Sequence, residues 1–89
     1  MDNFIKSYNL VENTFFKNQG SPLPINDEDF SDAFFNCFDY LSSLKKEEVE
    51  MLKTDLTLHC KIVMFNTIKL QILAENPSFL KIPGLYKIF

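Results

Sequence analysis

Large apolar residues recur at intervals of three and four residues along most of this chain, which is the spacing of one face of an α-helix. The first such segment runs from Asn3 to Lys17, and its apolar face consists of Phe4, Tyr8, Val11 and Phe15. We expect Asp2 or Asn3 to cap its start and Gly20 to end it. The pattern therefore predicts an N-terminal amphipathic helix.

A proline-containing segment, residues 21–26, follows this helix. Pro22 and Pro24 restrict the residues before them to extended conformations, so we expect a linker here. The dipeptide Gly20-Ser21 leaves two alternatives open. Residues 1–20 either belong to the same protein as the rest of the chain or are a segment fused to it.

The stretch "DEDFSDAFFNCFDYLSSL", from Asp27 to Leu44, predicts a second amphipathic helix. Asn26 or Asp27 is expected to cap it, and its early acidic residues suit the positive end of a helix. Cys37 flanks the apolar stripe and Phe35 lies beside it. The stripe itself consists of Phe30, Phe34, Phe38 and Leu41.

A third segment, Lys45 to Glu75, contains no Gly or Pro and ends at Asn76-Pro77, so we expect one long helix. Ser42 or Ser43 is its expected cap. The segment has two apolar faces, and a helix of this kind is buried on several sides. One face is a seam with the spacing of a helix pair, and it consists of Val49, Leu52, Leu56, His59, Val63, Asn66, Leu70 and Leu73. The other consists of Leu58, Ile62, Phe65 and Ile72.

Together these segments predict an all-α fold: a small helical bundle built on a helical hairpin with a long second helix. The hairpin spans residues 27–76, and the stripe of its first helix packs on residues such as Leu52 and Leu56. The apolar tail, residues 77–89, turns at Pro83-Gly84 and packs back. The second half of the long helix keeps apolar surface for a partner chain that completes the bundle. Its predicted partner-binding residues are Val63, Phe65, Ile68, Leu70 and Ile72.

Composition narrows the possible functions. The net charge is −3 and every basic residue is a lysine, so no basic patch or arginine favours direct nucleic-acid binding. No stretch is long and apolar enough for a membrane span, and no secretion leader is recognisable, so we expect a soluble intracellular protein. Apolar residues make up 46% of 89 residues, more than a thin core readily hides, which favours an interaction surface.

Candidate chemistry is sparse, and we expect no enzyme, cofactor or metal site. His59 is the only histidine, and we expect it, with Asn66, to be a polar seam residue that sets register. Cys37 and Cys60 are too few and too far apart for a disulfide framework or a zinc site, so we expect reduced, buried thiols. The acidic run that begins at Asp27 lacks the spacing of a calcium loop.

The sequence "DEDFSDAFFNCFDYLSSLKKEEVEMLKTDLTLHCKI", Asp27 to Ile62, resembles a BESS domain. The shared features are an acidic start, a Phe that opens a helix, apolar residues every three or four positions, the turn Leu41-Ser42, and the basic-apolar pair Lys61-Ile62. The resemblance implies a helical module of a nuclear chromatin or transcription regulator. Such a module contacts itself, a related helical domain or other chromatin proteins, without catalysis.

The residues themselves leave a second interpretation open. A viral or host-modulating helical bundle that binds a partner's amphipathic helix in a groove would have a similar composition.

Overall fold

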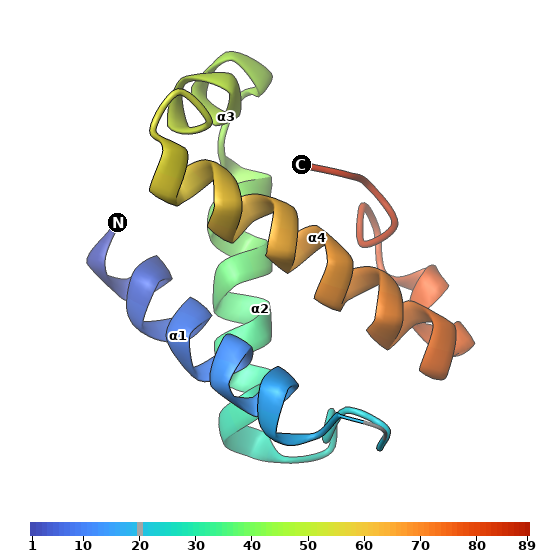
Figure 1. Cartoon of the computed structure of the whole chain (residues 1–89). Helices are drawn as coiled ribbons and strands as arrows, with labels where there is room; N and C mark the ends of the chain where they lie inside the picture. Colours follow the sequence, from blue (N-terminus) through green and yellow to red (C-terminus); the bar gives the residue numbers. More distant parts are fainter. Residues whose placement is uncertain (20) are drawn as a thin grey trace. The chain divides into compact units, whose positions relative to one another are not determined.

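A computed structural model describes residues 1–19 and 21–89, and this part of the chain is helical without any strand. It contains α1 (Asp2–Lys17), α2 (Glu28–Ser43), α3 (Lys46–Leu52), α4 (Leu56–Glu75) and the short 3-10 helix η1 (Pro77–Lys81) (Figure 1). The all-α fold predicted from the apolar spacing is confirmed.

The chain divides into two units, residues 1–40 and residues 41–89. The boundary lies inside α2, between Tyr40 and Leu41, whereas the sequence pattern places a division at the linker 21–26. The N-terminal helix and most of the Phe-rich helix therefore belong to one unit. The second unit holds the last residues of α2, α3, α4 and the tail.

In the first unit, α1 buries the predicted face of Phe4, Tyr8 and Val11, while Phe15 is half-buried. The helix begins after Met1 without any side-chain cap, so the expected cap at Asp2 or Asn3 is wrong. It ends where the side chain and the main-chain N–H of Asn18 both donate to the Thr14 carbonyl, at 2.9 and 3.1 Å. The predicted terminator, Gly20, lies outside the described residues.

The predicted cap of α2 is confirmed, because the Asp27 carboxylate accepts a hydrogen bond from the Phe30 N–H at 3.0 Å. The predicted stripe is also confirmed. Phe35 lies at its side and is half-buried; its ring meets the Phe34 ring edge to face, with the two ring centroids 5.1 Å apart. The buried residues of the stripe and its flank are Phe30, Phe34, Cys37, Phe38 and Leu41.

Three contacts join α1 to α2 within this unit. The Phe4 ring stacks on the Tyr40 ring at 5.1 Å, and the Tyr40 hydroxyl lies 3.8 Å from the Met1 sulfur. The Cys37 thiol lies 3.8 Å from the Phe4 carbonyl oxygen. Burial in this apolar setting raises the pKa of the Cys37 thiol to about 12, so it stays protonated at neutral pH.

In the second unit, the continuous helix expected over residues 45–75 is wrong, because residues 53–55 form a turn that separates α3 from α4. The Thr54 hydroxyl donates to the Met51 carbonyl at 2.6 Å, and the Asp55 carboxylate accepts from the Leu58 N–H at 3.2 Å. Short polar side chains that bond to nearby main chain can break a helix without any Gly or Pro.

The start of α3 also differs from the prediction. Ser42 and Ser43 belong to α2, and the cap position is Lys45. Its main-chain N–H donates to the Glu48 carboxylate at 2.9 Å, so a residue one turn inside the helix closes its start. The expected hairpin contact at Leu56 is also wrong, because this side chain is largely exposed.

The predicted end of α4 is confirmed. Asn76 donates to the Ile72 carbonyl from both its side chain and its main chain, at 3.1 and 2.8 Å, and Pro77 then opens η1. Gly84 has a φ of 77°, a conformation that favours glycine, and it lies in the predicted turn after Pro83. After this turn the tail runs back beside α4 (Figure 1). No helix of the described residues is long and apolar enough to cross a membrane.

Candidate protein-interaction surface

The buried face of α4 includes three of the five predicted partner-binding residues. Phe65, Ile68 and Ile72 are each 0% exposed, together with Ile62. The Phe65 ring stacks on the Phe89 ring of the tail, with centroids 6.4 Å apart. These residues are therefore part of the chain's interior, and they contact a partner only if the structure opens.

The other two predicted residues lie on the exposed side of α4. Val63 is 48% and Leu70 46% exposed, and Leu56, one heptad earlier, is 77% exposed. Because successive helical residues are about 100° apart, residues at seven-residue spacing lie about 20° from one another around the helix. Cys60, which is also exposed, lies beside them. We call Leu56, Cys60, Val63 and Leu70 the α4 strip.

None of the exposed residues between positions 56 and 74 is an aspartate, glutamate, lysine or arginine. The other exposed positions between residues 56 and 74 are Thr57, His59, Thr67 and Ala74. A helix that faces water usually presents charged residues there. The strip is thus an apolar helix face about 21 Å long, from the 1.5 Å rise per residue between its two outer leucines.

One expectation for this helix is corrected. Cys60 is exposed and not a buried thiol, whereas Cys37 is buried; both are free. The His59 ring nitrogen Nδ1 lies 3.3 Å from the Lys53 carbonyl oxygen, so this histidine bonds to the turn of its own chain. Its role in setting the register of a helix pair stays a prediction.

The tail is bound to α4 by Asn66 and Lys69, which are one helical turn apart. The Phe89 N–H donates to Oδ1 of Asn66 at 3.0 Å, and Nδ2 of Asn66 donates to the Phe89 carbonyl at 3.2 Å. The Lys69 ammonium donates to the Lys87 carbonyl and lies 4.2 Å from the centroid of the Phe89 ring. We call Phe65, Asn66 and Lys69 the tail clamp.

The tail clamp contains a fully buried lysine, because the side chain of Lys69 is 0% exposed. Within the described residues its ammonium group contacts the Lys87 carbonyl oxygen and the face of the Phe89 ring, and no Asp or Glu carboxylate. Desolvation by burial lowers the pKa of Lys69 to about 8. The sequence pattern did not single out Lys69, because a lysine on an apolar helix normally extends to water.

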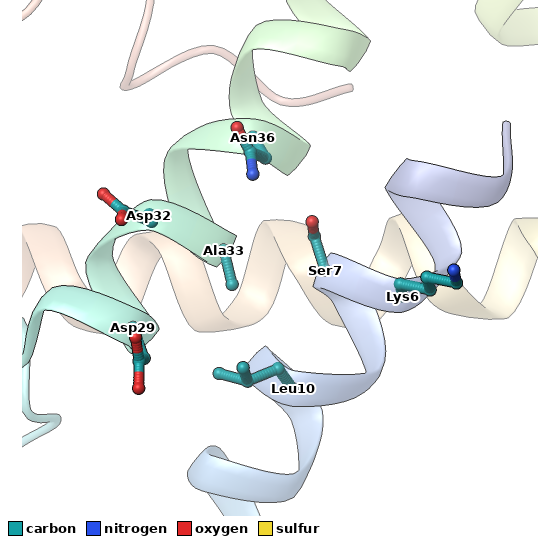
Figure 2. A pocket seen from close by; sticks show the side chains of 7 residues that line it. All are labelled: Lys6, Ser7, Leu10, Asp29, Asp32, Ala33 and Asn36. Carbon is teal, nitrogen blue, oxygen red and sulfur yellow. The ribbon is translucent and has the colours of Figure 1, made fainter.

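The first unit contains a shallow groove of about 280 Å³ between α1 and α2. Figure 2 shows Ser7, Leu10 and Ala33 between the helices, with charged groups around them. Its full lining is Lys6, Ser7, Leu10, Asp29, Asp32, Ala33 and Asn36. The carboxylates at its rim are exposed, and no histidine or cysteine lies beside Ser7 in this lining. The groove therefore offers no recognisable arrangement for nucleophilic or acid–base chemistry.

No group of three or more His, Cys, Asp or Glu side chains in residues 1–19 and 21–89 is placed to hold a metal ion. Comparison with protein-family models, with curated proteins and with solved structures found no match. The α4 strip and the tail clamp are therefore the features of the chain that bear on its function.

Proposed function

We propose that this protein is an interaction module that associates with a second copy of itself through the α4 strip. The observation behind this proposal is the exposure of Leu56, Val63 and Leu70 at seven-residue spacing on one helix face. Contiguous exposed apolar patches on a protein surface often mark interaction sites.

A second copy fits the strip because its two leucines are spaced symmetrically about Val63. Leu56 lies seven residues before it and Leu70 seven residues after it. An antiparallel pair with its two-fold axis at Val63 places each Leu56 against Leu70 of the second copy. This is the self-complementary contact that a two-fold interface requires, and the spacing is that of helix pairs.

Charge also favours this arrangement. The chain has a net charge of −3, so two copies repel one another weakly at most surfaces. The strip contains no Asp, Glu, Lys or Arg, so contact between its own residues buries no charged side chain. Burial of a Val or Leu side chain contributes roughly 1.5–3 kcal/mol when complete. Three such residues from each copy make a contribution comparable with the ~4–15 kcal/mol cost of association.

Light scattering after gel filtration tests this function. We expect the wild-type chain to be a dimer that dissociates on dilution. Val63→Lys places a charge at the two-fold axis and should give a monomer with an unchanged helical circular dichroism spectrum. Thr57→Lys is the matched control, because Thr57 is exposed on α4 about 120° from Val63 around the helix. It should remain dimeric.

Two outcomes would count against a second copy as the partner. A dimer that persists in Val63→Lys would place the contact elsewhere. A wild-type monomer at every concentration would instead favour the second interpretation from the sequence, in which the module binds an amphipathic helix of another protein.

The cellular setting is a further part of the proposal. The resemblance of residues 27–62 to a BESS domain supports a nuclear module among chromatin and transcription regulators. Those residues comprise α2, α3 and the first part of α4. A non-catalytic role fits the sparse chemistry of the groove and of the α4 strip.

A further inference from the structure

The end of the tail binds α4 directly after a turn at residues 83–86. Leu85 is 0% exposed, whereas Tyr86 and Ile88 are 60% and 63% exposed. Lys87 and Phe89 contact α4 through their main chain. Main-chain groups of the alternate residues 87 and 89 thus point toward α4, while the side chains of Tyr86, Lys87 and Ile88 are exposed.

The tail clamp contacts both the main chain and one side chain of this segment. Asn66 pairs with both the N–H and the C=O of Phe89, so it requires an extended residue at that point. Lys69 binds the carbonyl two residues earlier, at Lys87. Phe65 and Lys69 together select the side chain, because both contact the Phe89 ring.

The clamp residues are committed to this role by their burial. Asn66 and Lys69 are the two buried polar side chains among the described residues. A buried polar group costs free energy unless it is hydrogen-bonded. The hydrogen bonds of both residues go to the tail, and none of their buried polar atoms lacks a partner. Without a bound segment, α4 would expose an amide and an ammonium inside an apolar face.

We propose that the tail clamp is a peptide-binding site that also takes residues 85–89 of a second copy, so that two chains exchange their tails. The segment fits the site because it occupies it within one chain. The turn at Pro83-Gly84 is the hinge, since the glycine φ of 77° is what directs the tail back to its own α4. Exchange of an identical element between copies forms no new type of contact and is a low-cost route to association.

This inference goes beyond the proposed function and uses another side of α4. Asn66 and Lys69 lie about 60° and about 120° from Val63 around the helix. Within one chain the tail is present at an effective concentration of the order of millimolar. Exchange therefore needs high protein concentration or a chain whose own tail binds poorly.

Two complementary full-length variants test the exchange by nuclear magnetic resonance. The acceptor, Phe89→Ala, keeps the clamp and loses the ring of its own tail. The donor, Asn66→Leu, keeps the tail and loses the clamp. Both also contain Val63→Lys, so that association through the α4 strip does not contribute and the two proposals fail separately. The acceptor is labelled with nitrogen-15, and the side-chain amide signal of Asn66 is followed as unlabelled donor is added.

We expect the Asn66 signal to move toward its wild-type position as the donor is added. A donor that also contains Phe89→Ala should bind at least tenfold more weakly. An Asn66 signal that stays fixed up to about 1 mM donor, or that moves equally with both donors, would overturn the proposal. If Phe89→Ala reduces the helix content, Phe89→Leu serves as acceptor, because it keeps apolar volume and loses the ring contacts.

Discussion

Asn66 on α4 forms two hydrogen bonds with the main chain of Phe89, twenty-three residues further along the chain, accepting at 3.0 Å and donating at 3.2 Å. A single side chain thereby fixes both the position and the direction of the tail. This pairing explains why an asparagine lies on the buried side of an otherwise apolar helix.

Replacement of Asn66 tests the value of this pairing. Asn66→Ala leaves the N–H and the C=O of Phe89 without these partners, and we expect a loss of about 1–3 kcal/mol in the free energy of unfolding. Urea denaturation measures it. Asn9→Ala, at an exposed position of α1, is the matched control and should change stability by less than about 0.5 kcal/mol. Equal stability of the two variants would mean that the pairing of Asn66 with Phe89 contributes nothing to the stability of the fold.

Lys69 predicts an unusual dependence of stability on pH. Its pKa is about 8 in the folded chain and 10.5 ordinarily. Above about pH 8 the folded chain releases this proton while the unfolded chain still holds it, so stability rises from there to about pH 10.5. Cys37 acts in the opposite sense above about pH 9, because its pKa is raised from 9.0 to about 12 and the unfolded thiol ionises first.

Between about pH 8 and about pH 9 the contribution of Lys69 to this pH dependence is larger than that of Cys37. Urea denaturation there should show a free energy of unfolding that rises with pH, by at most ~1.4 kcal/mol per pH unit. Lys69→Met lacks the titrating group and should show no such rise. A wild-type profile that matches the Lys69→Met profile would contradict the assignment.

The sequence predicted α1 and α2 well because each has one apolar face. Phe4, Tyr8 and Val11 in one helix and Phe30 and Phe34 in the other are all buried, as the three-and-four spacing indicates. When a helix has a single apolar stripe, periodicity identifies both the helix and its buried side.

The same reasoning was insufficient for α4, which is apolar on nearly all sides. The seam with the better heptad spacing includes Leu56, Val63 and Leu70, which are exposed, and the other stripe is buried. Periodicity cannot choose between two apolar faces. Periodicity also misses the break at Asp55. Leu52 and Leu56 are four residues apart, which fits a continuous helix, although a turn separates them.

Lys69 and the role of Asn66 in binding the tail were outside the reach of pattern analysis. A polar residue on an apolar helix predicts an exposed position unless its partner is known. Here the partners are main-chain groups of residues 87 and 89, whose position depends on the turn at Gly84. Val63 and Leu70 of the α4 strip were predicted correctly as exposed apolar surface, whereas their binding role stays a prediction.

The aromatic stripe of α2 should dominate the stability of its unit. Phe34 is 0% exposed, so Phe34→Ala removes a full ring from the interior and should cost about 3–5 kcal/mol. Phe16→Ala is the matched control, because Phe16 is 49% exposed and should cost far less. Thermal denaturation of both variants decides this point, and a Phe34→Ala chain that melts with the wild type would refute the proposed core.

The turn between α3 and α4 depends on Asp55. Asp55→Ala removes the carboxylate that accepts from the Leu58 N–H, and we expect a loss of about 0.5–2 kcal/mol. Asp39→Ala, at an exposed position within α2, is the control without a cap. If Asp55→Ala instead raises both helix content and stability, α3 and α4 join into one helix when the cap is removed, and the turn is not intrinsic to the fold.

Cross-linking at Val63 tests the central claim, the pairing of two copies through the α4 strip. In a Cys60→Ser background, Val63→Cys places a thiol at the two-fold axis, and a short bis-maleimide reagent should convert most of the protein to a covalent dimer. Leu56→Cys should cross-link poorly alone, because its two copies are about 21 Å apart along the helix axis, and efficiently when mixed with Leu70→Cys. A yield for Val63→Cys no greater than that for Thr57→Cys would contradict the account.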